Sequence, residues 1–244
     1  MTSGPPRYRG VMLKLSGEAL MGDKPVGSLC IDFPFLKETA RQLCRVRESG
    51  TRVGVVVGGG NIWRGAEAAA QGMDRAAADY AGMLATVINA LALQDALEKL
   101  GAPVRTESAL TIERVAEPYL RERALRFWAQ GVILLFAAGT GNAFMTTDTA
   151  AALRAIELGA DVLLMAKNRV DGVYEADPWA NPEARRFDRL TYLEALNRGL
   201  EVMDTTALSL CMQHGLPIVV FDLRSSGSIE RAALGEHIGT LVTA

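Results

Sequence analysis

The chain has 244 residues, of which 49% are hydrophobic and 22% are charged, and its formal net charge is -2. This composition excludes a disordered chain, and the length allows roughly 70% or more of the unfolded surface to be buried in a core. The slightly acidic balance excludes partners that require a basic excess, such as nucleic acid or an anionic membrane. Any anion that the protein binds therefore needs a local site.

Cysteine and histidine are too sparse for several kinds of site. Cys30, Cys44 and Cys211 form no CxxC pair, which argues against a disulfide framework or a zinc knuckle and favours a reducing compartment. His214 and His237 leave little material for a metal cluster or a Ser/His/Asp triad. We therefore assign no metal-ligating residue.

Neither the first residues nor the longest apolar stretch predicts a membrane protein. Residues 1–10 are polar and proline-rich, unlike a signal peptide, and the uncharged stretch 80–94 is shorter than the about 20 residues of a spanning helix. We expect a cytoplasmic protein with a flexible N-terminus over residues 1–9 and a single domain over residues 10–244. Length alone also permits two domains.

Strands and helices are expected to alternate along the chain. Strands are predicted at 11–15, 52–57, 104–109, 132–136, 161–165, 218–221 and 239–243. Helices are predicted at 33–49, 74–100, 146–159, 191–197, 204–213 and 228–234, with charged helical segments within 111–130, a loop at 18–31 and dense turn signals at 167–182. This alternation predicts a mainly parallel sheet with helices on both faces, with ligands at the carboxyl ends of the strands.

Two helices have informative sequences. Asp32 is a suitable N-cap for the helix that follows, Pro34 fits its first turn, and Gly50 ends it. The middle of the helix at 74–100 is apolar nearly all round. Such a helix lies in a large core or at a subunit contact, and we favour the subunit contact because its charges lie at its ends.

Three glycine turns follow predicted strands, at 16–17, 58–60 and 139–141. The last of them lies between an apolar run and the helix start at Thr146-Thr147-Asp148, an arrangement whose free amides favour a phosphate. An ordinary strand-to-helix connection without a ligand is the alternative for any one such turn. Three turns on one sheet edge indicate a site for more than one phosphate group.

Common nucleotide-binding motifs are missing. In the dinucleotide fingerprint GxGxxG the third glycine would fall on Trp63 or Phe144, and the chain has no Gly-Lys dipeptide for a P-loop. It also has no His-Arg-Asp catalytic loop. A kinase with this sequence must be of another kind.

Lys14 lies near the end of the first apolar strand, in the sequence VMLKLSG. A lysine there is costly to bury unless its ammonium reaches an anion, such as a phosphoryl group in transfer. The alternative is an edge residue whose ammonium reaches solvent.

Six linked motifs, in order from about Arg9 to the C-terminus, resemble the bacterial UMP kinases. They are 14–20 (KLSGEAL), 58–61 with 64–65 (GGGN, RG), Asp79 with 82–86 (GMLAT), 139–142 with 146–148 (GTGN, TTD), 170–174 with 177–178 (VDGVY, DP) and 202–204 (VMD). The resemblance implies the amino acid kinase fold, a three-layer αβα sandwich with a mainly parallel central sheet. It also implies a homohexamer that uses Mg-ATP, with Mg²⁺ as cofactor, to convert UMP to UDP in pyrimidine nucleotide biosynthesis.

The resemblance also implies residue roles. Lys14 and Asp148 would be catalytic, with Asp148 orienting Lys14 and helping the metal shell. ATP would contact Lys14, Leu15, Ser16, Gly17, Gly60, Arg64, Asn168, Tyr174 and Asp177. UMP would contact Gly59, Asp79, Thr140, Gly141, Asn142, Ala143, Phe144, Met145, Thr146 and Thr147. The structural alternatives are helix capping for Asp148, a cap or exposed charge for Asp79, and a surface cation for Arg64.

The chain departs from the family pattern in several places. Ala143 stands where many members have proline, and Ala137-Ala138 precede Gly139 where glycine is common, so the turn is open to reshaping. Residues 165–169 resemble the longer loop of Gram-positive-type members, which leaves the assignment of Asn168 uncertain by a residue. The loop at 27–30 is lengthened where the family touches an allosteric GTP site, so GTP activation and UTP inhibition are family expectations only.

The chemistry expected for UMP needs no general base, because a phosphate monoester with a second pKa near 6 is mostly dianionic at pH 7. Positioning of the two anions and charge stabilisation by Lys14, Mg²⁺ and backbone amides would suffice.

Two rival functions remain open. One is a small-molecule kinase of the same fold acting on a carboxylate or carbamate, and the other is a non-catalytic nucleotide-binding protein.

Overall fold

Side chains of the first strand, β1 (Gly10–Leu15), alternate between the two faces of a sheet. The structure, a computed structural model, describes residues 8–21, 30–168 and 170–244. Val11 and Leu13 join one buried apolar cluster, whereas Met12 joins a second cluster on the opposite face. A strand that is buried on both faces is expected at the centre of a sheet that is covered by helices on both sides.

The strands of the described residues form one large sheet and one hairpin. They are β1, β2 (Arg52–Val57), β3 (Val104–Ser108), β4 (Glu117–Pro118), β5 (Ile133–Ala137), β6 (Val162–Lys167), β7 (Val173–Tyr174), β8 (Arg186–Phe187), β9 (Arg189–Thr191), β10 (Ile218–Asp222) and β11 (Thr240–Thr243). The order in the large sheet is β4-β3-β5-β2-β1-β6-β10-β11-β9, and β7 pairs with β8 separately. The strand pairs of the large sheet are parallel except β10 with β11.

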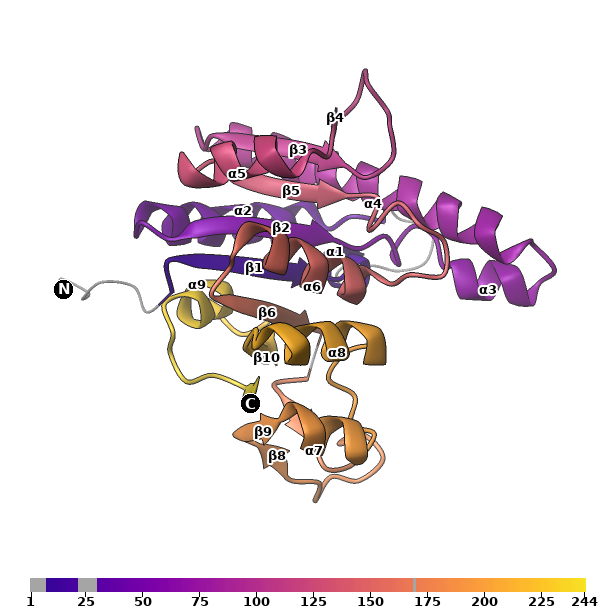
Figure 1. Ribbon diagram of the computed structural model, residues 1–244, viewed down its shortest axis with the longest axis vertical. Coiled ribbons are helices and arrows are strands. Elements are labelled where there is room, and N and C mark those ends of the chain that lie inside the picture. Colours follow the sequence, from indigo (N-terminus) through magenta and orange to yellow (C-terminus); the bar gives the residue numbers. More distant parts are fainter. Residues whose placement is uncertain (1–7, 22–29, 169) are drawn as a thin grey trace.

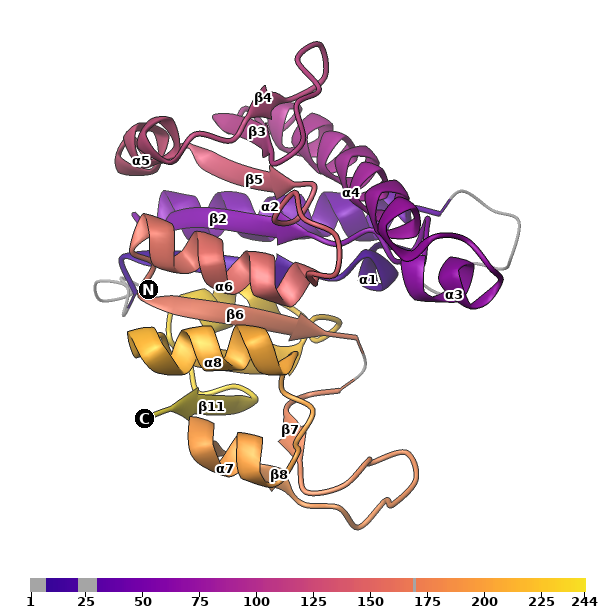
Figure 2. The same ribbon diagram turned by 45° about the vertical axis from the view of Figure 1, so that its right-hand side comes forward.

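Helices cover both faces of the sheet. In the described residues they are α1 (Gly17–Met21), α2 (Phe33–Glu48), α3 (Gly65–Ala70), α4 (Arg75–Glu98), α5 (Arg121–Ala129), α6 (Thr147–Leu158), α7 (Tyr192–Asn197), α8 (Thr205–His214) and α9 (Ser228–Ala233). Buried residues of α1, α2, α4 and α9 belong to one apolar cluster, and those of α5, α6, α7 and α8 belong to the other. The expected three-layer αβα sandwich is therefore confirmed (Figures 1 and 2).

Local capping signals were predicted correctly. The carboxylate of Asp32 accepts a hydrogen bond from the backbone N–H of Phe35 at 3.2 Å, at the start of α2. Gly159 and Gly215 end α6 and α8 in the left-handed region, with φ values of 63° and 60°. Only glycine adopts this conformation without a steric penalty, so these two positions fix where the helices stop.

Other local expectations were wrong. The expected loop at 18–31 begins with the helix α1, while residues 22–29, which include most of the lengthened loop at 27–30, lie outside the described residues. Within 111–130 only α5 is helical, because the chain before it pairs β4 with β3. The short elements α3, β7, β8 and β9 were not predicted, since they lack a periodic pattern long enough to recognise.

The expectation of a flexible segment at 1–9 falls mostly outside the described residues, which start at residue 8.

Helix α4 is the longest described helix. Its N-cap is Asp74, whose carboxylate accepts a hydrogen bond from Ala77 N at 2.9 Å. By length and composition alone α4 could cross a membrane, but it packs into the core on one face of the sheet, as a core helix of the same composition would. Its other face carries exposed apolar side chains, among them Leu84 and Ile88, each 51% exposed.

Candidate active site

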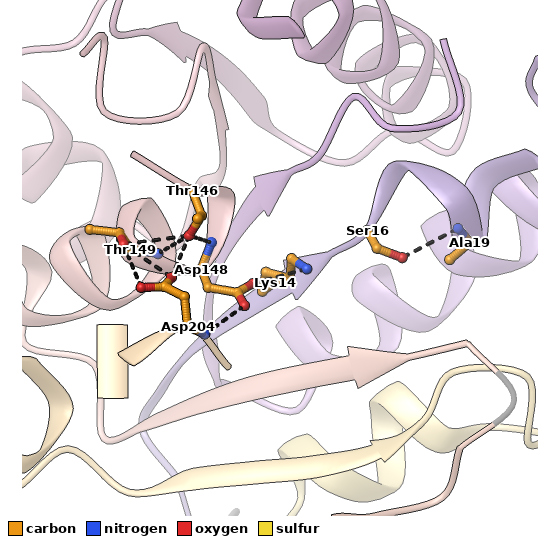
Figure 3. A network of polar contacts seen from close by, with 7 residues as sticks. All are labelled: Lys14, Ser16, Ala19, Thr146, Asp148, Thr149 and Asp204. Carbon is orange, nitrogen blue, oxygen red and sulfur yellow. Dashed lines mark hydrogen bonds and ion pairs between the residues drawn. The ribbon is translucent and has the colours of Figure 1, made fainter. Parts of the chain in front are cut away.

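Lys14 lies near the carboxyl end of β1, where it is in register with Val56 of β2 and Met165 of β6. Because β1 is between these two strands, Lys14 is not on a sheet edge. Its ammonium nitrogen is 3.0 Å from Oδ1 of Asp148, and the two side chains are 16% and 17% exposed (Figure 3). The pair lies at the carboxyl ends of the parallel strands, and the alternative of a solvent-directed edge lysine is wrong.

Asp148 lies in the first turn of α6, but it is not the cap of that helix. The cap is Thr146, whose hydroxyl accepts hydrogen bonds from the backbone N–H groups of Asp148 and Thr149, each at 3.1 Å. The carboxylate of Asp148 is thus free of a capping role and is directed at Lys14. Its position at a helix N-terminus is also favourable for a negative charge.

Asp204 joins the starts of α6 and α8. Its carboxylate caps α8 by accepting a hydrogen bond from Ala207 N at 3.0 Å, and it also accepts hydrogen bonds from the hydroxyls of Thr146 and Thr149. The backbone N–H of Asp204 donates to Oδ2 of Asp148 at 3.4 Å (Figure 3). The motif at 202–204 therefore holds the Asp148 carboxylate from the side opposite Lys14.

Lys167, at the end of β6, is a site residue that the sequence analysis missed. Burial lowers its pKa, as does the nearby charge of Lys14, while Asp148 and Glu201 act in the opposite direction. The ammonium groups of Lys14 and Lys167 thus both lie within electrostatic reach of Asp148. The signal was available, because VLLMAK ends in a lysine after an apolar strand, just as the segment around Lys14 does.

The glycine turns after β1 and β2 pack directly on one another. A Cβ atom at Gly17 would lie 2.5 Å from the backbone nitrogen of Gly60, and one at Gly59 would lie 2.8 Å from the carbonyl oxygen of Gly82 in α4. Both distances are too short for any side chain. Glycine is therefore required at these two positions by close backbone contact, and the turns converge as predicted.

A cavity of about 470 Å³ opens where the turns meet α4. Of the residues predicted to bind UMP, those that line it are Gly59, Asp79, Thr140, Met145, Thr146 and Thr147. Among the described residues of the loop, Gly141, Asn142, Ala143 and Phe144 lie outside this lining, and Phe144 is 69% exposed. Gly60, which was predicted to bind ATP, also lines this cavity.

Asp79 projects from α4 into this cavity. Its Oδ2 accepts a hydrogen bond from the backbone N–H of Phe144 at 2.9 Å, and Arg75 pairs with it at 3.0 Å. The side chain is 14% exposed, and Asp74 is the helix cap, so both structural alternatives for Asp79 are wrong. Arg75 also lines the cavity and was missed, although its spacing of four residues from Asp79 was a signal.

The other predicted ATP residues take various positions. Arg64 pairs with Glu18 at 2.8 Å and with Glu67 at 3.5 Å, and its side chain is 48% exposed. The alternative of a surface cation therefore stays open for Arg64. The hydroxyl of Ser16 accepts a hydrogen bond from Ala19 N at 3.3 Å (Figure 3). Leu15 is fully buried, and its carbonyl oxygen accepts a hydrogen bond from Gly58 N at 2.8 Å.

A second cavity, of about 450 Å³, lies beyond β6. Its lining includes Lys167, Tyr174, Asp177 and Trp179. Asn168 is not brought to it within the described residues, because its side-chain oxygen accepts a hydrogen bond from Arg224 at 2.8 Å. Residue 169 of the same loop is outside the described residues.

Known proteins share this fold. Residues 10–222 match the model of the amino acid kinase family. The chain belongs to the amino acid kinase family. Among solved structures, it is similar to the UMP kinase of Bacillus anthracis, with 38% identity, a TM-score of 0.92, and coverage of 97% of this chain and 96% of that one. The UMP kinase of Ureaplasma parvum is 36% identical with a TM-score of 0.91, covering 98% of this chain and 100% of that one.

A more distant structure is the uridylate kinase of Archaeoglobus fulgidus, at 29% identity and a TM-score of 0.73, covering 96% of this chain and 99% of that one. The resemblance to bacterial UMP kinases that the six motifs indicated is therefore confirmed. In this amino acid kinase, several of the residues expected to contact UMP line the first cavity, and Tyr174 and Asp177, expected to contact ATP, line the second.

Proposed function

We propose that the protein transfers the terminal phosphoryl group of ATP to UMP and releases UDP and ADP. The likeness to bacterial UMP kinases over nearly the whole chain is the main support. The Lys14–Asp148 pair adds to it, because Asp148 follows residues that line the first cavity and its charge acts on Lys167, which lines the second. The reacting groups are expected to meet at this pair.

The first cavity is proposed as the UMP site. Asp79 offers a carboxylate to ribose hydroxyls, which are hydrogen-bond donors. The positive end of α6, whose first residue Thr147 lines the cavity, favours the phosphate. Residues 141–144, outside the cavity lining, would complete the site from the loop. The predicted roles of Gly59 and of residues 140 to 147 are retained in this proposal.

The second cavity is proposed as the adenine side of the ATP site. Tyr174 and Asp177 line it, and Lys167 lies where phosphate groups would pass toward Lys14. Residues 14–17, Gly60 and Arg64 would contact the phosphates. Asn168 has the weakest support among the predicted ATP residues, because its side chain is held by Arg224.

The proposed reaction depends on charge rather than on proton transfer. UMP is already mostly dianionic at neutral pH, so no general base is needed. Lys14 and Lys167 would neutralise charge on the moving phosphoryl group, and Asp148 would hold Lys14 in place. Positioning two anions that repel one another is the remaining task of the site.

Mg²⁺ is proposed as the cofactor that accompanies ATP. Kinase sites usually hold Mg²⁺ through one or two carboxylates and the substrate phosphates, and Asp148 supplies a suitable carboxylate. Within the described residues, no group of three or more His, Cys, Asp or Glu side chains forms a site of its own. A metal bound through the nucleotide fits this donor set, and it would screen charge on the phosphates.

The remaining family features are proposals too. The exposed apolar stripe on α4, formed by Tyr80, Leu84, Ile88 and Leu91, supports assembly into a homohexamer through that helix. We also propose a single domain over residues 10–244, a cytoplasmic location and a role in pyrimidine nucleotide biosynthesis. Activation by GTP and inhibition by UTP are proposed from the family alone.

A panel of acceptors tests the function. Purified protein is given Mg-ATP with UMP, CMP, AMP, aspartate or N-acetylglutamate, and ADP release is followed with a coupled assay. The proposal expects turnover with UMP well above the others. Turnover only with an amino acid would support another kinase of this fold, and absence of turnover with every acceptor would support a non-catalytic nucleotide-binding protein.

A further inference from the structure

One face of α4 bears two buried polar residues in an otherwise apolar environment. Thr86 is 4% exposed and Asn89 is fully buried. They are three residues apart, so they lie on the same side of the helix, one turn from each other. This side faces the sheet, opposite the exposed stripe at 80, 84, 88 and 91. Burial of such groups is costly unless each is hydrogen-bonded, and their partners reveal what they do.

Thr86 binds the start of the loop that surrounds the first cavity. Its hydroxyl donates to the carbonyl oxygen of Met83 at 2.7 Å and accepts a hydrogen bond from the backbone N–H of Ala138 at 2.6 Å. Ala138 has a φ of 61°, in the left-handed region that a residue with a side chain seldom adopts. A conformation of this kind persists only when its surroundings hold it, and the Thr86 hydroxyl does so.

The far end of the same loop is held in the same way. Of the residues that the structure describes, Ala138 and Phe144 are the non-glycine residues with positive φ. Each donates its backbone N–H to a side chain of α4, Ala138 to Thr86 and Phe144 to Asp79. Helix α4 therefore fixes both ends of the segment 138–144, which we call the acceptor loop.

Asn89 holds the neighbouring glycine turn. Its side-chain nitrogen donates to the carbonyl oxygen of Gly58 and to Oδ1 of Asn61, each at 2.7 Å. Asn61 returns a hydrogen bond to Oδ1 of Asn89 at 3.1 Å. Gly59 of this turn also packs against the backbone of α4 between Gly82 and Thr86. The turn at 58–61 and the acceptor loop are thus both tied to α4, through its side chains at positions 79, 86 and 89.

We propose that Thr86 and Asn89 are positioning residues, which set the acceptor loop and the 58–60 turn at the spacing that the acceptor cavity needs. Thr86 also lines the first cavity, but its hydroxyl is engaged by Met83 and Ala138, and Asn89 lies outside that lining. The kinetic part of the test, which measures KM values for UMP and ATP, rests on the proposed function. Thr86 should act on the acceptor side only, whereas Asn89 should affect both substrates, because Gly59 is assigned to UMP and Gly60 to ATP.

The test compares Thr86→Val, which replaces the hydroxyl by a methyl group, with Thr86→Ser, which keeps it. Leaving a buried donor without its acceptor corresponds to a change of about tenfold or more in a binding constant. We expect Thr86→Val to raise the KM for UMP by about tenfold and the KM for ATP by no more than about twofold. Thr86→Ser should stay close to the unaltered protein, and Asn89→Leu should raise both KM values.

The control is Leu93→Val, a mild core substitution on the same helix at a fully buried residue. It should lower the melting temperature and leave both KM values unchanged, which separates positioning from loss of stability. Equal kinetics for Thr86→Val and Thr86→Ser would overturn the proposal. So would a wild-type KM for UMP in a folded Thr86→Val protein.

Hydrogen exchange provides a readout that does not depend on the substrate. In the unaltered protein the Ala138 amide should be protected, and in Thr86→Val its exchange should accelerate together with that of the acceptor loop, while α2 stays protected. Unchanged exchange at Ala138 would overturn the positioning role even if UMP proved not to be the acceptor. An unaltered protein without UMP turnover would instead disprove the proposed function alone.

Discussion

The ammonium of Lys14 and the carboxylate of Asp148 lie 3.0 Å apart, although one is on β1 and the other on α6. Lys167 adds a second ammonium group to the surroundings of Asp148, and Glu201 and Asp204 add carboxylates there. A phosphoryl group in transfer would meet the ammonium groups of Lys14 and Lys167 at this point.

Lys14→Ala should lower kcat by about 10² or more while the fold stays intact, because the group that meets the developing charge is removed. Steady-state kinetics with UMP and Mg-ATP measure the effect, and circular dichroism checks the fold. Lys99→Ala is the matched control, since Lys99 is 70% exposed and pairs with the neighbouring Asp95 on the helix surface. Near-normal turnover by a folded Lys14→Ala protein would remove the role assigned to Lys14.

Lys167→Met should lower kcat by about 10² but should not lower the melting temperature at neutral pH. Burial lowers the Lys167 pKa below its ordinary 10.5, so the folded protein bears a cost whenever this lysine is protonated. Between the two pKa values the unfolded chain binds more protons, and stability therefore rises with pH as the cost is lost. The variant should show a smaller rise in stability as pH approaches 10.5, measured by thermal melting across a pH series. An identical pH dependence would contradict this account of Lys167.

Asp79→Asn should raise the KM for UMP by about tenfold and leave the KM for ATP nearly unchanged. The amide can still accept the hydrogen bond from Phe144 N, but it loses the negative charge and one acceptor for ribose hydroxyls. Asp95→Asn makes the same chemical change at an exposed position of the same helix and should have no effect on either KM. A variant in which only the KM for ATP changes would contradict the assignment of Asp79 to the UMP site.

Leu84→Glu combined with Ile88→Glu should dissociate the assembly. Both side chains are 51% exposed on α4, and two carboxylates facing a partner would be desolvated without a counter-charge. Light scattering should show the unaltered protein at a multiple of its 26.2 kDa mass and the variant at a lower multiple. Leu193→Glu, at an exposed residue of α7, is the control and should leave the mass unchanged. An unaltered protein that is already monomeric would contradict the proposed hexamer.

The three cysteines should differ widely in their reaction with an alkylating reagent. Cys30 is exposed and should react first, whereas Cys211 is buried and burial raises its pKa to about 12. Cys44 should be intermediate, because partial burial, reinforced by Glu48, raises its pKa. Since the thiolate is the reactive form, alkylation at pH 8 followed by mass spectrometry should leave Cys211 unmodified until denaturant is added. Rapid labelling of Cys211 in the native protein would show that α8 does not pack as described.

Much of the local structure could be predicted from residues close together in the chain. Asp32 caps α2, and Gly159 and Gly215 end their helices, because capping hydrogen bonds and left-handed turns involve only a few neighbouring residues. Lys14 was recognised from one strand of six residues, since a lysine among buried apolar residues is itself unusual. The short elements α1 and α3 lacked such a signal and were missed.

The family motifs indicated which residues belong to the site, but not how they meet. Only the order of the strands brings α6 to β1, so that Asp148 faces Lys14, and directs Asn168 to Arg224 instead of into the second cavity. The roles of Lys167, Thr86 and Asn89 also depend on the tertiary structure. In the sequence Lys167 belongs to an apolar strand, and Thr86 and Asn89 belong to an apolar helix, and only their partners in the fold indicate what they do. The sequence by itself determined the longer strands and helices and the glycine turns, because those depend on interactions between near neighbours. The tertiary structure decided which charges and buried polar groups are paired, because that depends on packing between distant segments.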